Sequence, residues 1–246
     1  NYLRHRVLPA LTERWPQAVT GLARTAEHLG EAQGLLDELA LLDLQAASKA
    51  SAFPWLGLPS LALAPLCELS DARQRNALRH WLAPLTRLPD SDHWAGWHSL
   101  RDAKGDAQPL WRLADGELHR CGQRIWWLPS TRSEFSDATV SWPDPQNPLE
   151  LPGNGQLTLT GEAPEGPLEV RYRQGGEILE VPGRGRRDLK RLLNESGLPG
   201  FVRGRLPLLY QGEQLLGVPS LAGLWPAPSD DWQLHWMPQT CDQGLS

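Results

Sequence analysis

The spacing of the apolar residues changes near residue 108, and this change constrains the fold more than any other feature of the sequence. Before it, apolar side chains recur at intervals of three and four, as at Leu3, Val7 and Leu11, which is the period of an amphipathic helix. After it, short apolar runs alternate with Gly, Pro, Asn and Asp, which is typical of strands and turns. The chain therefore combines a helical first half with a strand-rich second half.

Residues 1–128 are expected to form an all-helical domain that ends in a small β-hairpin. The three-and-four spacing of a long helix extends from residue 16 to about residue 48. Further helices are expected over 70–85 and 90–102. A hairpin follows, with its turn at Ala114-Asp115-Gly116. The inward positions expected for the long helix are Val19, Leu22, Ala26, Leu29, Leu36 and Leu39.

Residues 129–156 have no apolar period and are rich in proline, serine, aspartate and asparagine, so we interpret them as a linker or surface loop. Residues 157–246 carry several short strands and one main helix, with Asp188 near its start and Gly197 as its stop. This order has no alternation of strand and helix. It predicts an α+β domain with an antiparallel or mixed, partly closed sheet.

Basic residues are concentrated in the second half. The chain has a formal net charge of −5, yet residues 171–205 contain nine basic and four acidic side chains. Such an asymmetry favours an anionic partner. Arginines also stand next to glycines in "RYRQGGE" and "PGRGRRDLKRLL", and the second stretch leads into a helix start that suits a phosphate oxygen. A solvated helix face with ordinary turn glycines is the competing interpretation.

Other chemistries have little support in the sequence. The seven histidines form no metal-ligand pattern, and there is no GxSxG elbow, Walker loop or dinucleotide fingerprint. Three widely spaced cysteines indicate a reducing compartment. No apolar run reaches the length of a membrane span and no signal-peptide pattern is present, so we expect a cytoplasmic protein without membrane contact. The start at Asn1 suggests a piece of a longer protein.

Three stretches together resemble one family, the bacterial tRNA(Ile)-lysidine synthetases. "NYLRHRVLPAL" is similar to the segment that leaves the family's ATP-binding domain, and "LSDARQRNALRHWL" with "RIWWLP" is similar to its helical substrate-binding domain. The most specific match is "VRYRQGGE" followed by "GRGRRDLKRLLNESGLPGFVRGRLPLLYQGEQLLGVPSL", which is similar to the terminal domain. The resemblance covers nearly the whole chain.

This resemblance implies an enzyme that uses ATP and magnesium to join lysine to the wobble cytidine of an isoleucine tRNA. The family's ATP site lies in an N-terminal PP-loop domain with a Ser-Gly-Gly-x-Asp-Ser signature, which this sequence lacks. The resemblance therefore implies a tRNA-holding portion that is inactive alone, has no cofactor of its own and needs the missing catalytic domain as a partner. Contacts to the anticodon side and acceptor end of the tRNA are expected, and a homodimer is possible.

The resemblance also implies site residues. Arg4 matches a family position beside the ATP and lysine site, so it would border the active site of the full enzyme; a solvated helix face is the alternative for Arg4. Arg203 or Arg205 could instead form a structural ion pair, with Glu177 as a candidate partner. No catalytic or metal-binding residue is expected within the chain. The expected tRNA contacts are Arg171, Arg173, Arg184, Arg186, Arg187, Lys190, Arg191, Arg203, Arg205, Arg73, Arg75 and Arg79.

Two other classes of function compete with tRNA binding. A non-catalytic protein-interaction module of a larger cytosolic protein would use tryptophans and hairpin strands to bury a partner. Twelve tryptophans spread over both halves are more typical of core residues than of one binding patch. A self-contained hydrolase lacks a nucleophile or metal motif.

Overall fold

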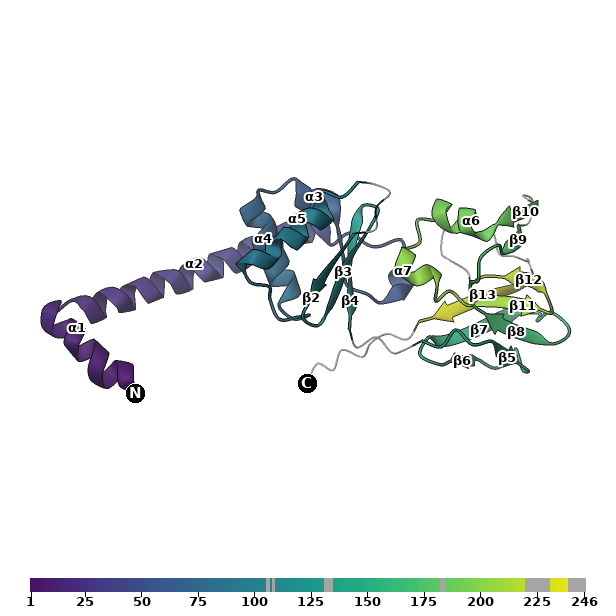
Figure 1. Cartoon of the computed structure of the whole chain (residues 1–246), viewed down its shortest axis with the longest axis horizontal. Coiled ribbons are helices and arrows are strands. Elements are labelled where there is room, and N and C mark those ends of the chain that lie inside the picture. Colours follow the sequence, from purple (N-terminus) through teal and green to yellow (C-terminus); the bar gives the residue numbers. More distant parts are fainter. Residues whose placement is uncertain (105–106, 108, 131–134, 182–184, 220–230, 239–246) are drawn as a thin grey trace.

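The computed structural model describes residues 1–104, 107, 109–130, 135–181, 185–219 and 231–238. It shows an elongated molecule with a helical arm at one end and a strand-rich part at the other (Figure 1). The α+β class is confirmed. In the described ranges the strands form open sheets, so the expected partial closure is not seen.

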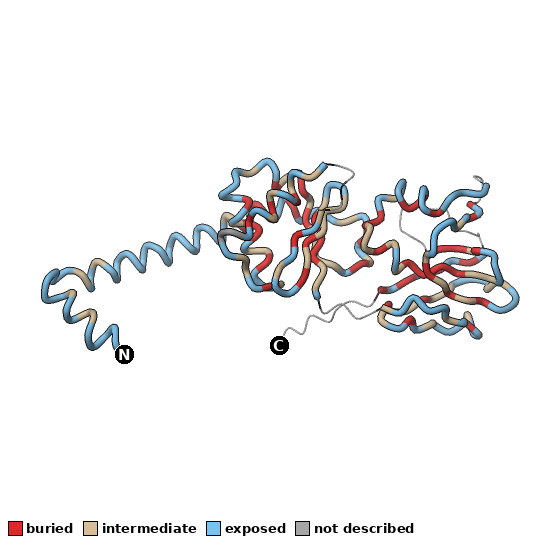
Figure 2. The backbone as a smooth tube through the Cα atoms, in the orientation of Figure 1, coloured by how far each residue is buried: buried red, intermediate tan, exposed pale blue. Residues whose placement is uncertain are grey.

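The N-terminal arm consists of a short π-helix, Leu3–Val7, followed by α1, Leu8–Arg14, and α2, Ala18–Ala47. Helix α2 has 30 residues, about 45 Å at 1.5 Å per residue, and its first two-thirds project away from the body (Figures 1 and 2). Only its last turns pack on α3 and α4. The long helix was predicted correctly. Its apolar residues were expected to face inward, and for most of them this expectation is wrong. Val19, Leu22, Leu29 and Leu36 are all exposed.

The first globular part combines short helices with a four-stranded antiparallel sheet of order β1-β4-β3-β2. The hairpin predicted around Ala114 and Asp115 joins β2 to β3, but β1 and β4 extend it into a sheet. The bounds are η2 Pro54–Leu56, β1 Ser60–Ala62, α3 Leu63–Cys67, α4 Asp71–Leu82, η3 Ser91–Trp94, α5 Ala95–Arg101, β2 Leu110–Leu113, β3 Gly116–Cys121 and β4 Arg124–Pro129.

The second part has a four-stranded sheet, β12-β11-β8-β5, a three-stranded sheet, β13-β7-β6, and the hairpin β9-β10. All pairings are antiparallel. The bounds are β5 Val140–Trp142, β6 Leu149–Leu151, β7 Gly155–Gly161, β8 Leu168–Arg171, β9 Ile178–Val181, β10 Gly185–Asp188, α6 Leu189–Glu195, α7 Gly200–Arg203, β11 Leu208–Gln211, β12 Gln214–Gly217 and β13 Trp232–Met237.

Two strands lie in the stretch that we interpreted as linker or surface loop. β5 pairs with β8, and β6 pairs with β7, so residues 140–142 and 149–151 belong to the sheets of the second part. These strands are only three residues long. The sequence shows no period over such short runs, because each strand gains its stability from partners elsewhere in the chain.

The second part has one core that extends into the first part. Trp142 and Val170 from the larger sheet, Leu157 and Trp236 from the smaller sheet, and leucines of α6 share this cluster. Phe53, Leu56 and Trp126 of the first part belong to the same cluster. Eight of the twelve tryptophans are buried: Trp94, Trp97, Trp111, Trp126, Trp127, Trp142, Trp232 and Trp236. The tryptophans therefore act mainly as core residues.

Candidate nucleic-acid interface

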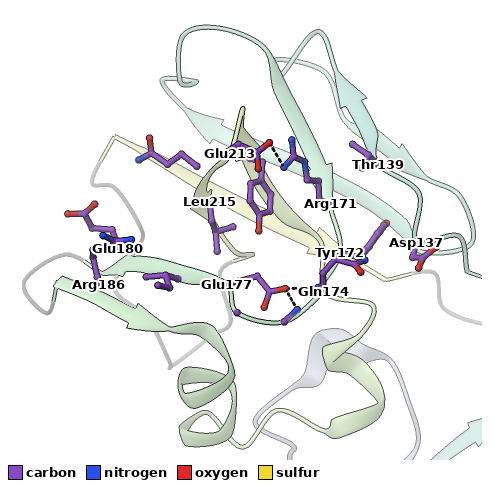
Figure 3. A pocket seen from close by; sticks show the side chains of 15 residues that line it. Asp137, Thr139, Arg171, Tyr172, Gln174, Glu177, Glu180, Arg186, Glu213 and Leu215 are labelled. Atoms are coloured by element: carbon purple, nitrogen blue, oxygen red, sulfur yellow. Dashed lines mark hydrogen bonds and ion pairs between the residues drawn. The ribbon is translucent and has the colours of Figure 1, made fainter.

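A cavity of about 800 Å³ lies beside the β11–β12 hairpin (Figure 3). It contains Arg171 and Arg186, two of the residues predicted to contact phosphate. Four carboxylates line the same cavity: Asp137, Glu177, Glu180 and Glu213. Because these acids outnumber the arginines, this hairpin pocket is unfavourable for a phosphate group.

Arg171 is neutralised on β8. Its guanidinium donates to Glu169 at 3.0 and 3.2 Å, lies 3.6 Å from the Glu213 carboxylate, and stacks 4.8 Å from the centre of the Tyr210 ring. The hydrogen bond that Arg171 donates to Glu169 raises the pKa of Arg171, although burial opposes the shift. Arg171 therefore braces neighbouring strands and has little positive charge to offer to an RNA.

Arg173 pairs with Glu177 at 3.5 Å, and the Glu177 side chain is only 6% exposed. Burial alone would raise the pKa of Glu177. The backbone N–H groups of Gly175 and Gln174, which donate to its carboxylate, together with the charge of Arg173, hold that pKa below its ordinary value. The structure thus pairs Glu177 with Arg173 and not with Arg203, one of its two candidate partners.

The N-terminus of α6 is capped by a side chain of the same segment. Asp188 is the N-cap, and its carboxylate accepts a 2.9 Å hydrogen bond from the Arg191 backbone N–H. A negative side chain here satisfies the helix start and repels a second anion. Gly197 follows with φ of 68° and ends the helix region as predicted. Gly185 of the glycine-rich stretch begins strand β10, which precedes this helix, whereas Gly183 lies outside the described residues.

Arg203 and Arg205 are half-buried and hydrogen-bond to the backbone of the second part. Arg203 donates to the carbonyl oxygen of Leu198 at 2.8 Å and to the side chain of Asn194. Arg205 donates to the carbonyl oxygen of Gly153 and lies 5.0 Å from the Phe135 ring. Both arginines therefore hold loops that precede the β11–β12 hairpin, whose turn contains Gly212 with φ of 55°.

The remaining predicted residues fall into two groups. Arg73 pairs with Asp43, which is 3% exposed, and Arg191 pairs with Glu195 at 2.9 Å. Arg184 lies outside the described residues. Five others are exposed and, within the described part of the chain, make no side-chain hydrogen bond or ion pair: Arg75, Arg79, Arg186, Arg187 and Lys190.

These free cations lie on two separate surfaces. Arg75 and Arg79 are on α4 in the first part, whereas Arg186, Arg187 and Lys190 are on β10 and the start of α6 at the far end of the second part (Figure 1). A ligand that contacts both surfaces must be long and anionic. Arg4, on the exposed arm, is well separated from both.

Sequence reasoning missed Arg120 and Arg124, which flank the β3–β4 turn and line a second cavity between the two parts. Their positions on either side of Cys121-Gly122 in a predicted strand region could have placed them together at a hairpin end. Across the described ranges, no cluster of three or more His, Cys, Asp and Glu side chains is arranged for a metal ion. Of the described helices, even the long α2 is not apolar enough to cross a membrane.

Comparisons with known proteins match both globular parts. Residues 61–126 match the TilS substrate binding domain, and residues 168–236 match the TilS substrate C-terminal domain. The architecture is thus a substrate-binding domain followed by a C-terminal domain of this class.

The chain is also similar to proteins named tRNA(Ile)-lysidine synthase. It is 61% identical to that of Pseudomonas syringae over 246 residues, covering all of this chain and 55% of the relative. It is 57% identical to that of Pseudomonas aeruginosa, covering all of this chain and 56% of the relative. It is 36% identical to that of Salmonella typhimurium, covering 89% of this chain and 51% of the relative. The chain belongs to the tRNA(Ile)-lysidine synthase family and spans about half the length of these relatives.

A solved structure of a TILS C-terminal domain covers 42% of this chain at 18% identity, with a TM-score of 0.30. This likeness is too low to bear on the fold. The family assignment depends on the two domain matches and the sequence relatives.

Proposed function

We propose that this chain is the tRNA-holding portion of a tRNA(Ile)-lysidine synthase. The observation that supports this most directly is the presence of free cations in both family domains: Arg75 and Arg79 on α4, and Arg186, Arg187 and Lys190 on β10 and α6. Phosphate contacts supply most sequence-independent affinity for nucleic acids. The helical part would contact the anticodon side of an isoleucine tRNA, and the second part would contact the acceptor end.

The intact enzyme would ligate lysine to the wobble cytidine of the tRNA with ATP. The residues of this chain do not fit an ATP and magnesium site. The sequence has no Ser-Gly-Gly-x-Asp-Ser loop, and the hairpin pocket would place four carboxylates against a triphosphate. We therefore assign ATP, magnesium and catalysis to a domain outside this chain. The tRNA substrate also implies a cytoplasmic location.

The α1–α2 arm supports a contact with that catalytic domain. Val19, Leu22, Leu29 and Leu36 are between 43% and 66% exposed, and a row of exposed apolar side chains marks an interaction surface. A homodimer through the same face is the alternative. Sedimentation of the parent and of the variant Leu22→Ser, Leu29→Ser distinguishes the two alternatives. A homodimer formed by this face would dissociate in the variant. If the parent is already a monomer, the face is available to the catalytic domain.

The tRNA-binding proposal is tested by measuring tRNA affinity at several salt concentrations. The triple variant Arg186→Gln, Arg187→Gln, Lys190→Gln should bind every tRNA more weakly. Each lost phosphate contact should reduce the log–log salt slope by about 0.7 to 0.9. Arg191→Gln is the matched control, because Arg191 lies on the same helix but is paired with Glu195.

Two results would contradict the proposal. If the parent does not bind tRNA, the protein-interaction module becomes the better account, supported by the exposed arm. If the parent binds tRNA but the triple variant keeps the parent's affinity and slope, then these cations do not form the contact. Melting of each variant shows whether it remains folded.

A further inference from the structure

A second cavity, of about 700 Å³, lies where the two parts of the chain meet. It is lined by the segment 51–53, the β3–β4 turn and the segment 194–200 between α6 and α7. Trp126 and Phe201 pack edge to face across this boundary, with 6.2 Å between ring centres. We name this cavity the junction pocket. Its charged lining residues are Arg120, Arg124 and Arg203.

The junction pocket differs from the hairpin pocket in its charge. Three arginines line it, and no aspartate or glutamate is among its described lining residues. The hairpin pocket has four carboxylates against two arginines. Clefts lined by one sign of charge concentrate field lines and attract the opposite charge. An anion is therefore favoured in the positively charged junction pocket over the hairpin pocket, where carboxylates are in excess.

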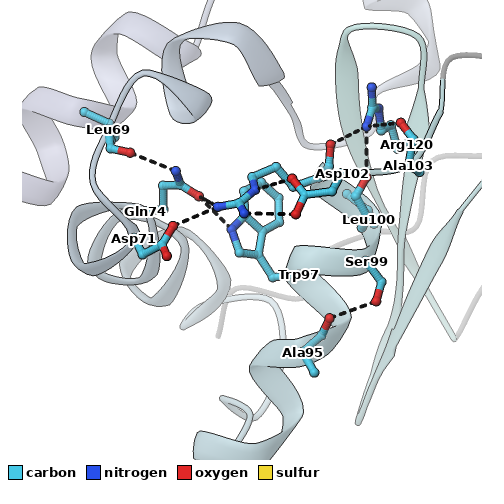
Figure 4. Close-up of polar contacts among 11 residues, drawn as sticks. Leu69, Asp71, Gln74, Ala95, Trp97, Ser99, Leu100, Asp102, Ala103 and Arg120 are labelled. Carbon is cyan, nitrogen blue, oxygen red and sulfur yellow. Dashed lines mark hydrogen bonds and ion pairs between the residues drawn. The ribbon is translucent and has the colours of Figure 1, made fainter.

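The hydrogen-bond partners of these arginines are electrically neutral. The Asp102 carboxylate, which interacts with Arg120 through its charge, is itself hydrogen-bonded to Arg101. Arg120 donates to the carbonyl oxygens of Leu100, Arg101 and Ala103 (Figure 4). Arg203 donates to the Leu198 carbonyl oxygen and to the Asn194 side chain. Carbonyl and amide oxygens orient a guanidinium but leave its full charge in place. The orientation is thus fixed by the protein, while the charge remains available to a ligand.

Arg124 carries a further unused donor. Its Nη2 donates to the Lys49 carbonyl oxygen at 2.8 Å and to the Ser60 hydroxyl at 3.0 Å, whereas its Nε is buried without a hydrogen-bond partner in the described part of the chain. Burial lowers the pKa of both Arg124 and Arg203. Half-buried cations without a counter-charge are costly, so an anion that enters this pocket reduces that electrostatic cost.

The lining favours a phosphate over a base. Trp126 and Phe53 are the aromatic residues of the described lining, and their exposed fractions are 2% and 6%. A nucleobase needs an accessible ring face on which to stack, and neither ring offers one. Gly122, Gly197 and Gly200 leave the backbone open beside the arginines, which allows close approach of a small tetrahedral anion.

We infer that the junction pocket binds a phosphate group of the RNA backbone through Arg120, Arg124 and Arg203. This inference rests on the proposed function and adds a third contact between the two cationic surfaces. Because residues from both parts hold the same phosphate, the contact also links RNA binding to the relative position of the two parts.

The test uses the double variant Arg124→Gln, Arg203→Gln in the chain as described. Its affinity for tRNA should fall about tenfold, and the salt slope should fall by about 0.7 to 0.9 for the lost phosphate. The variant with Arg124→Lys and Arg203→Lys keeps the charge and should recover most of the slope. Arg112→Gln is the control, because Arg112 is 79% exposed and already paired with Glu117; it should leave both quantities unchanged.

The outcomes separate this inference from the proposed function. A parent that does not bind tRNA contradicts the proposed function. Melting temperatures measured in inorganic phosphate and in chloride at equal ionic strength then test the junction pocket alone. The inference is supported if phosphate stabilises the parent more than the glutamine variant. It is contradicted if phosphate stabilises both equally. If the parent binds tRNA and the folded glutamine variant keeps the parent's salt slope, the inference is overturned, even where affinity falls through altered packing. If the double glutamine variant does not fold, Arg124→Gln and Arg203→Gln are measured singly, and the same comparison of salt slopes with the parent decides.

Discussion

The indole Nε1 of Trp97 donates a 2.9 Å hydrogen bond to Oε1 of Gln74, and both side chains are buried (Figure 4). The same oxygen accepts from Arg101 at 3.0 Å, and the Gln74 amide donates to the Leu69 carbonyl oxygen at 2.8 Å. One glutamine of α4 therefore satisfies polar groups from α5 and from the loop before α4. This arrangement joins α4, the helix that carries Arg75 and Arg79, to the core.

Gln74→Ala should lower the free energy of unfolding by about 1 to 3 kcal/mol, because it leaves the buried indole N–H without an acceptor. Denaturant unfolding followed by tryptophan fluorescence measures the change. Gln33→Ala on the exposed arm removes a 2.9 Å hydrogen bond to Asp37 that is open to solvent, and it should change stability by less than about 0.5 kcal/mol. Equal effects of the two substitutions would show that the buried network is not stabilising.

Glu177→Gln should destabilise the chain in a pH-dependent manner. The folded-state pKa of Glu177 lies below its ordinary value of 4.5, so its contribution is present above that value and is lost as the pH falls through the folded pKa. The difference between parent and variant should therefore be greatest near neutral pH and shrink in acid. Glu195→Gln, at a 55% exposed side chain, is the control. A difference that is constant from neutral pH to pH 3 would contradict this prediction.

Gly212→Ala should destabilise the β11–β12 hairpin by about 1 kcal/mol, because alanine is strained at φ of 55°. Gly204→Ala is the matched substitution at a glycine with φ of −72°, and no atom lies within 4 Å of the added Cβ at either position. Gly204→Ala should raise stability by about 0.4 to 1 kcal/mol, because alanine makes the unfolded chain less flexible. Thermal melting of both variants tests whether backbone conformation alone accounts for the opposite signs.

Limited proteolysis should cut first between residues 129 and 140. We predicted the domain boundary within 129–156. Because β5 and β6 are paired with other strands, residues 135–139 are the described unpaired segment that precedes β5. The two fragments should remain together on a sizing column, because Trp126 packs on Phe201 across the boundary. Early cleavage within α6 would place the boundary elsewhere.

With ATP, lysine and an isoleucine tRNA, this chain alone should form no lysidine. The four carboxylates of the hairpin pocket disfavour a triphosphate there, and the sequence lacks the PP-loop signature. Analysis of the tRNA nucleosides after incubation provides the measurement, with a full-length relative as the positive control. Turnover that persists through repurification would place catalysis within this chain.

Much of the fold could be predicted from local sequence. Helix α6 depends on Asp188 at its start and Gly197 at its end, and the β11–β12 turn depends on Gly212; each signal acts within a few residues. The length of α2 was likewise visible in its periodicity, because helical hydrogen bonds are local. The family could also be assigned from three stretches of sequence.

The tertiary structure decided which arginines keep their charge. Arg171 and Arg186 look alike in the sequence, yet Glu169 and Glu213 neutralise one while the other stays free. Arg120 and Arg203 stand 83 positions apart by their numbering but line one pocket. Apolar periodicity shows which face of a helix or strand is buried, but the distance between two charges depends on how the elements pack. The electrostatics of the candidate site therefore followed from contacts between distant segments, which no local pattern contains.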